Sequence, residues 1–541
     1  MLDSLATMAP NLDVYNGSTT GSGDEALVVM WDGPDDVQHP RNWTPVRKWR
    51  NVLLISIQAT LSPMASVVLA VGGQAVADDF GLTDEYTPTL PTALFVLGFG
   101  LGPLYLAPLS ELYGRRAVYL SCFAMFTVFN ICCAVSPNIA ALTVFRLLAG
   151  MAGSAGPSIG GGTIGDMYSP ERRGRAQALY SFGPTGGSAI GGVVGGFILR
   201  GTGSWRWLAW IMAMASGLTS LASVFLLHET YAPFLLRKKA AALTKSGVPC
   251  VHVQAPGPVP DRGSCCSDLA VVLRTMTRAA MMLFTSPVCT AMSLYMAVIY
   301  GILYLHMVTL PLLFSAESLY GLPSYRWPEA LTGLSYLGVG LGSVAGALLS
   351  AALVNRTYAS MKARHGATSR HAHGDAGAGG GGAHPNSEDM DDRTPEYRMP
   401  FMQVGALIVP AGLLIFALTA GKDNVHWMVP LVGAAVFSTG MLMTYISVTT
   451  YMVDSFETYA ASALAAVTVS RSVLGCIFAF VGNGLYRRLG YEWGTLLLFF
   501  LCLVITPLPT VFYYWGPRLR KIGPFAKAAP GSSNTDGARP F

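Results

Sequence analysis

The sequence predicts an all-α polytopic membrane protein whose chain crosses the bilayer about twelve times. Hydrophobic residues make up 52% of the 541 residues and charged residues only 12%, which is roughly half the charged share of a soluble domain. The apolar residues also gather in blocks, and residues 401–420 and 495–514 contain no charge at all. Such runs are long enough to span a bilayer. In lipid they must be helical, because the backbone has to satisfy its own hydrogen bonds.

Twelve apolar blocks are predicted as spans, six on each side of a long polar stretch. The first six cover residues 51–73, 88–109, 117–136, 138–164, 176–199 and 207–227. The second six cover residues 285–313, 329–354, 401–420, 427–450, 459–484 and 493–514. This layout is typical of two helix bundles packed around a central cavity.

Domain boundaries follow from these spans. We predict an N-terminal six-helix bundle at 51–227, a central loop at 228–284 and a C-terminal six-helix bundle at 285–514. Residues 1–50 and 515–541 are predicted as tails. The Gly-rich polar segment 355–400 is predicted as a disordered loop, because it cannot bury enough apolar surface to fold. Its irregularly spaced histidines favour a solvated linker over a metal site.

Lysine and arginine residues set the predicted orientation. Most of the 35 fall in the tails and in loops on one side of the membrane. Since basic loops stay in the cytoplasm, both termini are expected there, in a multi-pass protein of the cell membrane. The three N-x-S/T sequons, at Asn16, Asn42 and Asn355, lie on this side, so no glycosylation is expected.

Two function classes are disfavoured by the sequence. The basic residues are spread between the spans and the net charge is only +5, so no nucleic-acid partner is expected. The chain also has no nucleophile elbow, no phosphate loop and no cluster of metal ligands in its spans. An enzyme is therefore not expected, and the expected partners are a small organic substrate and the lipid bilayer.

The turn between the second and third spans reads PLSELYGRR, residues 108–116. Gly114 permits a tight turn, Glu111 places a charge at the helix end, and Arg115 and Arg116 can anchor to the anionic inner leaflet. The pattern resembles the loop signature of the major facilitator superfamily, in which an acid, a glycine and two basic residues form a cytoplasmic gate. The resemblance places Asp166 and Glu171 near this gate.

Further segments resemble the fungal drug:proton antiporter branch of that superfamily, which has twelve spans. Glu111 stands where the broad superfamily usually has Asp, and Ala107 replaces an expected glycine. The other similar segments are Trp31–Trp43, Gly160–Ala176, His228–Ala240, Ser286–Leu305 and Tyr451–Ala466. The resemblance implies the major facilitator fold and export of small organic molecules in exchange for protons. It also implies alternating access, no cofactor beyond the proton gradient, a monomer, and the fungal plasma membrane.

Arg146 opens the sequence RLLAGMAG in the fourth span, about 12 Å from the start of that helix. An arginine inside the membrane is costly and is a functional candidate. With Gly150 it also matches the superfamily's Arg-x-x-x-Gly motif, which is linked there to proton transfer. Alternatively, Arg146 extends to the surface or bonds backbone carbonyl groups.

The fifth span is rich in glycine. Its residues Gly183, Pro184, Gly187, Gly191 and Gly192 match the antiporter signature of the superfamily, whereas Ser188 replaces the second proline. Small residues also allow two helices to pack closely, so helix packing alone could explain this pattern.

Arg471 lies near the middle of the eleventh span, about 18 Å from residue 459. No Asp or Glu lies at the predicted midplane of any span. A cavity for organic cations would need a buried carboxylate or an aromatic cage. An arginine instead binds carboxylates through paired hydrogen bonds. The charges therefore favour an anionic or neutral substrate, such as a dicarboxylate. The alternative is that Arg471 only holds helices together.

The seventh span carries Tyr295, Tyr300, Tyr304 and His306. Tyr300 and Tyr304 are four residues apart and share a helix face, where they could stack on a substrate or simply pack. The pKa of His306 could suit proton coupling; alternatively, it is a satisfied polar residue near the outer surface.

Asp454 and Glu457 precede the eleventh span. The pattern Asp-x-x-Glu before an apolar run favours a helix cap and gate over a cation site.

Three functions remain open from the sequence. The first is a proton-driven exporter of a secondary metabolite, drug or organic acid. The second is a proton-symport importer of a small organic nutrient, because the same fold serves both directions. The third is a receptor or scaffold without flux, which predicts that Arg146 and Arg471 are dispensable.

Overall fold

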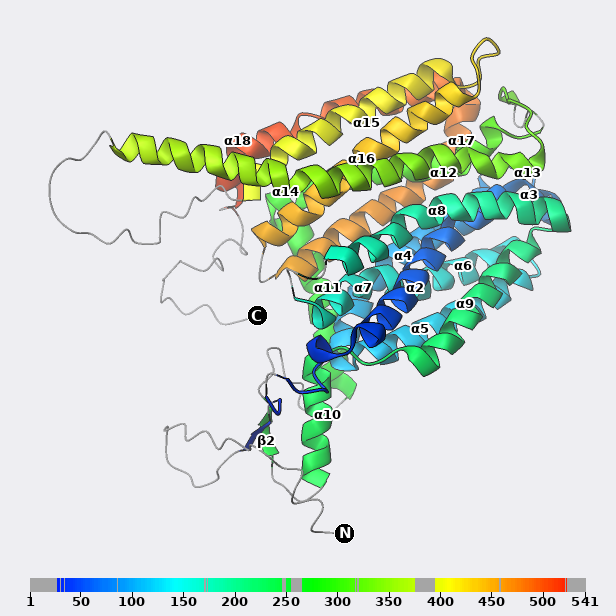
Figure 1. The fold of residues 1–541 in the computed structure, drawn as a ribbon. Helices are drawn as coiled ribbons and strands as arrows, with labels where there is room; N and C mark the ends of the chain where they lie inside the picture. The colour runs from blue at the N-terminus through cyan, green and yellow to red at the C-terminus, as the bar shows by residue number, and fades with distance from the viewer. Residues whose placement is uncertain are drawn as a thin grey trace.

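The structure is a computed structural model. It describes residues 27–522, except 30, 34, 85, 170–171, 173, 246–249, 254–264, 317, 319–320, 375–394, 457–458 and 521. Nearly all of the described chain is helical, and long helices lie side by side in two groups (Figure 1). Ten helices within the described residues are long and apolar enough to cross a membrane. Residues 175–202 add one more as a bent pair.

The N-terminal group holds six crossings. It consists of α2 (Pro45–Val71), α4 (Leu90–Leu112), α5 (Arg115–Ala134), α6 (Ile139–Gly153) with α7 (Ala155–Met167), α8 (Gly174–Thr202) and α9 (Arg206–Leu226). Helices α6 and α7 form one crossing that is interrupted at Ser154. The short helix α3 (Gly73–Phe80) follows α2, and a 3-10 turn at Thr87–Thr89 leads into α4.

The C-terminal group also holds six crossings. It consists of α12 (Pro287–Leu313), α13 (Glu329–Thr332) with α14 (Tyr336–Gly374), α15 (Met399–Thr419), α16 (Met428–Ser455), α17 (Ala460–Ile505) and α18 (Leu508–Arg520). Short 3-10 turns at Gly333–Ser335 and Pro395–Arg398 precede α14 and α15.

Helix α17 contains the eleventh crossing and the first part of the twelfth, which continues into α18. Gly490 has a non-helical backbone with φ 71° and ψ 172°. On the two sides of Gly490, the hydroxyl groups of Tyr486 and Thr495 lie 3.1 Å apart, although nine residues of continuous helix would separate them by about 13 Å. The chain therefore reverses at Gly490. The predicted eleventh and twelfth spans are both present, and the fold of two six-helix bundles is confirmed.

The segment between the bundles is partly folded. It contains α10 (Ala232–Lys245), α11 (Cys265–Thr285) and the strand β2 (Cys250–Val253). Strand β2 pairs in parallel with β1 (Leu27–Val29) near the N-terminus. This two-stranded sheet is a small departure from the predicted all-α architecture. No local pattern predicts this sheet, because the pairing joins segments more than 200 residues apart.

Helix α14 is longer than the sequence predicted. It continues through residues 355–374, which were assigned to a disordered loop. These residues contain no proline and are rich in alanine and basic residues, which favour helix. The helix ends at Gly374, where the glycine run begins; residues 375–394 lie outside the described part.

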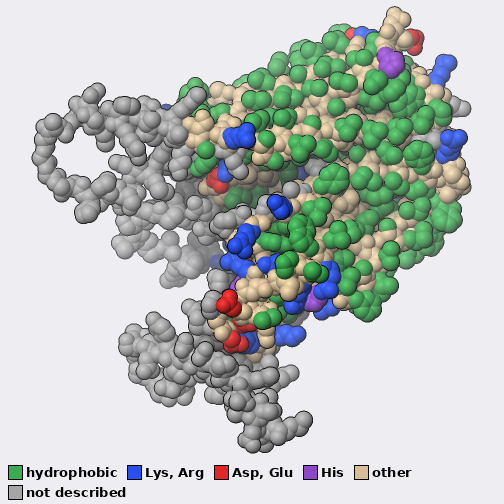
Figure 2. Space-filling view, viewed as in Figure 1, with side chains coloured by type: hydrophobic (Ala, Val, Ile, Leu, Met, Phe, Trp, Pro, Cys, Tyr) green, Lys and Arg blue, Asp and Glu red, His purple; other side chains and the backbone are tan. Residues whose placement is uncertain are grey.

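The two ends of the bundles differ in their charged residues. The basic side is the end where α2 begins and α18 ends; Arg47, Arg50, Arg115, Arg116, Arg398 and Arg520 lie there. The opposite side is the end where α3 lies. Space-filling atoms show a surface that is mostly hydrophobic over the helices, with Lys and Arg gathered toward the ends (Figure 2).

The two bundles pack against each other mainly in the half near the opposite side. Val67, Val71, Ala93 and Val96 of the N-terminal bundle belong to the same buried cluster as the core of the C-terminal bundle. These residues come from the opposite-side ends of α2 and α4. Toward the basic side, Figure 2 shows a hollow between the halves. The bundles are therefore closed together on the opposite side.

Candidate functional site

A buried polar cluster lies midway along the helices of the C-terminal bundle. The guanidinium carbon of Arg471, on α17, lies 4.6 Å from the ring centre of Tyr300 on α12 and 5.1 Å from that of Tyr445 on α16. Tyr304, one turn after Tyr300, has its ring centre 5.0 Å from that of Tyr300. We call Arg471, Tyr300, Tyr304 and Tyr445 the arginine–tyrosine cluster. The predicted shared face of Tyr300 and Tyr304 is confirmed.

The charge of Arg471 has no carboxylate partner among the described ion pairs. Arg471 donates a side-chain hydrogen bond to Tyr445, whereas its Nε atom is buried without a hydrogen-bond partner. An unpaired buried N–H group is costly. Arg471 and Tyr445 are both only partly buried. Arg471 can therefore donate hydrogen bonds to an anion that enters between the bundles.

Glycine brings the helices of this cluster together. A side chain at Gly475, one turn after Arg471, would place its Cβ 3.2 Å from Val96 and 3.4 Å from the Tyr300 ring. At Gly100 on α4 the Cβ would lie 2.1 Å from the Cβ of Ser472. These contacts hold α17 directly against α4, so Arg471 lies at the junction of the two bundles.

The cluster is hydrogen-bonded to the N-terminal bundle. The hydroxyl of Tyr304 donates to Ser66 Oγ on α2 across 3.5 Å, and Ser66 Oγ donates to the carbonyl of Pro63 across 2.7 Å. This bond joins residues from opposite halves of the chain. It would have to break or lengthen if the bundles moved apart at this level.

Arg146, on α6, bonds a backbone carbonyl group of α2 within the N-terminal bundle. Its Nη2 donates to the carbonyl of Ala65 across 2.6 Å, and its guanidinium carbon lies 4.5 Å from the ring centre of Phe95. Its Nε is buried without a hydrogen-bond partner. The structure thus shows the backbone contact that the sequence left as an alternative. Arg146 and Tyr304 therefore contact consecutive residues of α2, Ala65 and Ser66.

The two other residues singled out on α12 point elsewhere. His306 is buried inside the C-terminal bundle, with its ring centre 4.9 Å from that of Phe416 and 5.4 Å from that of Phe437. Its Nδ1 bonds the carbonyl of Ile302 across 2.9 Å, and its Nε2 has no hydrogen-bond partner. Tyr295 is buried in the same bundle. No described contact joins either residue to Arg471, so three of the six predicted midspan residues, Arg471, Tyr300 and Tyr304, belong to one cluster.

A second charged cluster lies on the basic side, where the predicted gate was placed. Arg115, at the start of α5, donates from Nε to Asp166 of α7 across 3.4 Å and from Nη1 to Ser110 of α4. Its guanidinium carbon lies 4.8 Å from the ring centre of Tyr231. Burial and then the charge of Glu111 raise the pKa of Tyr231. Arg115 and Asp166 are thus brought together as the resemblance implied.

Glu229 completes this cluster and was missed from the sequence. Its carboxylate accepts the backbone N–H groups of Arg115 and Arg116, both at 3.0 Å. It therefore places a negative charge at the N-terminus of α5, which the helix dipole favours. Gly114, with φ +88°, makes room, since a Cβ there would lie 2.5 Å from the carboxylate. The sequence feature that could have identified this residue is the acid in the segment HETYAPF, which follows the sixth predicted span.

The remaining predicted gate residues form fewer described contacts. Arg116 donates to the carbonyl of Val224 across 2.8 Å. Glu111 is exposed and forms no described ion pair. Glu171 and Glu457 lie outside the described residues.

The capping role proposed for Asp454 is wrong. Helix α16 runs to Ser455, so Asp454 lies in its last turn, and α17 begins with Tyr459 as its cap residue. Asp454 instead forms an ion pair with Arg398 at 2.5 Å, at the start of α15. The sequence underestimated the length of α16, because its polar last turn resembles a loop.

The C-terminal bundle repeats the arrangement of the basic side. Arg115 at the start of α5 pairs with Asp166 near the end of α7, and Arg398 at the start of α15 pairs with Asp454 near the end of α16. Buried Glu396 also accepts Arg520 of α18 at 2.8 and 3.0 Å. These three pairs each stay within one bundle.

The glycine motif of α8 has two faces. A Cβ at Gly183, Gly187 or Gly191 would lie 2.5–2.7 Å from oxygen atoms of Thr60 and Met64 on α2. A Cβ at Gly192 would lie 2.2 Å from the ring of Tyr336 on α14. Pro184 lies inside the helix, near its bend. The first face packs the N-terminal bundle, as the packing interpretation predicted, and Gly192 packs the two bundles together.

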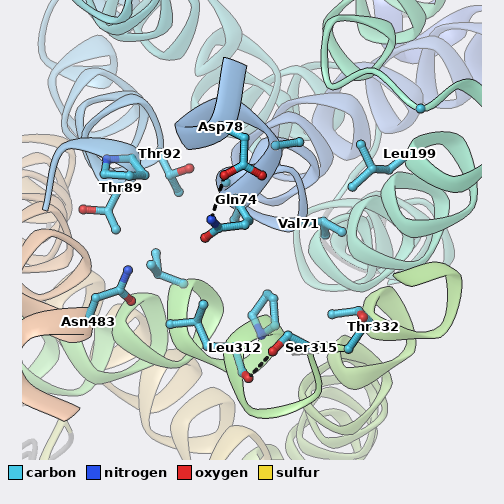
Figure 3. Close-up of a pocket in the computed structure, with 18 residues that line it drawn as sticks. Val71, Gln74, Asp78, Thr89, Thr92, Leu199, Leu312, Ser315, Thr332 and Asn483 are labelled. Carbon is cyan, nitrogen blue, oxygen red and sulfur yellow. Dashed lines mark hydrogen bonds between the residues drawn. The ribbon is translucent and has the colours of Figure 1, made fainter. Parts of the chain in front are cut away.

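A cavity of about 440 Å³ opens between the bundles on the opposite side (Figure 3). Gln74, Asp78, Thr89 and Thr92 project from the N-terminal bundle, and Asn483 and Ser315 from the other. Gln74 donates to Asp78 across 3.0 Å. Asp78 supplies the one charge among the lining residues. Sequence reasoning missed this cavity because its residues are scattered over helix ends.

Metal chemistry has no support in the part of the chain that the structure describes, where no group of three or more His, Cys, Asp or Glu side chains could hold an ion.

Two bundles of six helices, joined at a polar midspan cluster, define a multi-pass membrane protein of the secondary transporter class. The chain belongs to the Major Facilitator Superfamily, whose sequence profile matches residues 55–480. It is similar to the MFS-type transporter penM of Penicillium rubens, with 36% identity over 94% of this chain and 92% of penM. It is also similar to the efflux pump radE of Floropilus chiversii, with 34% identity over 96% of this chain and 90% of radE.

Solved structures support the same fold. A D-xylose–proton symporter matches with a TM-score of 0.57, covering 88% of this chain and 98% of the symporter. The sequence identity is 13%, so this likeness concerns the fold alone. The resemblance to fungal transporters of this superfamily is confirmed, and the relatives are named as transporters and efflux pumps.

Proposed function

We propose that this protein exports a small organic molecule in exchange for protons. The observation that carries the proposal is Arg471, a partly buried arginine at the junction of the two bundles that has no described carboxylate partner. Such a costly group is retained in a span when it serves a pathway. The names of the fungal relatives, which include an efflux pump, support export.

Transport would proceed by rocking of the bundles around the arginine–tyrosine cluster. The opposite side is packed closed through Gly192, so the described arrangement corresponds to access from the basic side. We propose that the basic side faces the cytoplasm of a cell with this transporter in its plasma membrane. The clusters around Arg115 and Arg398 would then act as the inner gate, since neither pair crosses between the bundles here.

Arg146 is the proposed link to the proton. It bonds Ala65, and the next residue, Ser66, bonds Tyr304 of the substrate cluster. A change of hydrogen bonding at Arg146 would therefore reach the cluster through two consecutive residues of α2. Export and proton symport into the cell use the same parts, so the direction has to be measured.

The first test compares the culture media of three strains: one with the gene, one without it and one with Arg471→Ala. Export of an anion predicts that the same organic acid disappears from the medium of both altered strains and accumulates in their cells. An importer predicts the reverse change, with uptake lost. A receptor without flux predicts that the Arg471→Ala strain secretes as the unaltered strain does.

Proton coupling is tested in sealed vesicles that contain the purified protein. An imposed pH gradient should drive accumulation of the identified acid, and a protonophore should abolish it. Accumulation that survives the protonophore contradicts proton exchange.

A further inference from the structure

We infer that the arginine–tyrosine cluster selects a planar, conjugated monocarboxylate, such as an aromatic acid, in preference to dicarboxylates, amines or saturated acids. This inference rests on the proposed transport function and names the class of its substrate.

The first step concerns the direction from which an anion can reach Arg471. The guanidinium carbon lies over the rings of Tyr300 and Tyr445, at 4.6 and 5.1 Å from their centres. Stacked on rings, a guanidinium keeps its N–H groups in its own plane, where they bind a carboxylate through two parallel hydrogen bonds. The unpartnered Nε of Arg471 belongs to that edge. A carboxylate therefore enters edge-on, between the rings rather than over them.

The tyrosine rings determine which organic group can be attached to the bound carboxylate. A group attached to a carboxylate in this plane extends beside the tyrosine rings. The rings of Tyr300 and Tyr304 are inclined at 58° to each other. A flat ligand beside them can therefore stack on the face of one ring and contact the edge of the other. Aromatic ligands gain from both arrangements, whereas a saturated ring of equal size gains only from contact area. The cluster thus favours a flat conjugated body.

The third step concerns the number of charges. The other midspan arginine, Arg146, donates to the carbonyl of Ala65 and lies over Phe95 within the N-terminal bundle. A second carboxylate on the substrate would therefore be buried without a cation, which is strongly unfavourable. An ammonium group would face the positive charge of Arg471 directly. A single negative charge fits, and a dicarboxylate, one of the candidates that the sequence left open, does not.

The test measures binding to the full-length protein in nanodiscs by calorimetry, independently of transport. Four bicyclic probes of similar size are compared: 2-naphthoate, its fully saturated decahydro analogue, 2-naphthylmethanol and 2-naphthylmethylammonium. Succinate adds the dianion. We expect 2-naphthoate to bind best. Its saturated analogue should bind several-fold more weakly, in line with roughly a 3- to 10-fold loss of aromatic contact. Absence of 2-naphthoate binding, or tighter binding of the ammonium probe or of succinate, overturns the inference.

Variants assign the binding to the cluster. Arg471→Gln should weaken the binding of 2-naphthoate by roughly 10- to 100-fold and leave the affinity for 2-naphthylmethanol unchanged. Arg471→Lys keeps the charge but loses the planar edge. Its affinity for 2-naphthoate should lie between that of the unaltered protein and that of Arg471→Gln. Tyr300→Leu should make the affinities for 2-naphthoate and for its saturated analogue equal. The matched control is Arg206→Gln, because Arg206 pairs with Asp79 on the opposite side. An equal loss in the control, or none in the Arg471 variants, contradicts the site.

Two results separate this inference from the proposed function. Proteoliposomes that bind 2-naphthoate through Arg471 but never move it contradict transport and leave the ligand class in place. Proteoliposomes that move 2-naphthylmethylammonium against a pH gradient while 2-naphthoate does not bind support transport and overturn the ligand class.

Discussion

Arg115 illustrates how one residue serves both local structure and the proposed gate. Its backbone N–H donates to Glu229, while its guanidinium donates to Asp166 and Ser110. The contact with Glu229 uses only the backbone at the start of α5, whereas the contacts with Asp166 and Ser110 use the side chain. Substitution of the side chain therefore tests the gate without removing the helix cap.

We predict that Arg115→Glu lowers flux by roughly tenfold or more, because it places a third carboxylate beside Asp166 and Glu229 and like charges at this distance repel strongly. The measurement is flux per molecule at the membrane, with surface protein quantified in parallel. Arg172→Glu is the control, since Arg172 is exposed in the next loop of the basic side. Normal flux in the Arg115 variant would remove this residue from the gate.

Asp166 and Glu229 also show that an acid is useful at two different places around one arginine. Asp166 neutralises the guanidinium, whereas Glu229 neutralises the start of the helix. Only the first was expected from the motif. The second depends on the turn at His228–Thr230 approaching α5 from the end of α9, more than 100 residues further along the chain.

At the scale of elements, α8 uses its glycines on two faces. Gly187 meets the backbone of α2 within one bundle, and Gly192 meets Tyr336 of the other bundle. Substitutions on the two faces should therefore have different effects. The first face determines whether the N-terminal bundle packs, and the second determines how closely the bundles approach on the opposite side.

We predict that Gly187→Val destabilises the protein by about 1–3 kcal/mol, because the new Cβ would overlap the Thr60 carbonyl and overpacking carries that cost. Gly192→Val should leave the melting temperature closer to normal but hold the opposite side open, since it displaces Tyr336 between the bundles. Thermal unfolding in detergent reports the first effect. Labelling of a cysteine at Thr89, in the opposite-side cavity, reports the second. Equal behaviour of the two variants would refute the two-face assignment.

At the scale of the whole molecule, the two ends of the transporter are unlike. The opposite side is closed by apolar and glycine contacts between bundles, whereas the basic-side ion pairs stay within each bundle. The opposite-side cavity carries the charge of Asp78. A monoanion that passed between Arg471 and this cavity would be repelled by Asp78 in either direction.

Accessibility tests the orientation of the molecule. In a variant without the nine native cysteines, we predict that a membrane-impermeant maleimide labels Gly201→Cys in intact cells. It should label Gly165→Cys only after permeabilisation. Both positions have open space around the new Cβ, and they lie on α8 near the opposite side and on α7 near the basic side. The reverse pattern would mean that the basic side faces outward.

The sequence by itself determined the twelve crossings, their division into two bundles and the family. Apolar length and the absence of water in the bilayer leave a long apolar run no alternative to a helix. The shared face of Tyr300 and Tyr304 follows from helical periodicity in the same way. The packing glycines of α8 follow from the need for close backbone approach. These features depend on residues that are near one another in the chain.

Only the tertiary structure decided which of these residues meet. It brought Tyr445 to Arg471, turned Arg146 toward Ala65, removed Tyr295 and His306 from the cluster, and placed Glu229 at the start of α5. It also showed the reversal at Gly490 inside one apparent helix. Each of these contacts depends on how helices rotate and pack against partners far away in the chain. Helical periodicity identifies a face but does not specify which helix that face will meet.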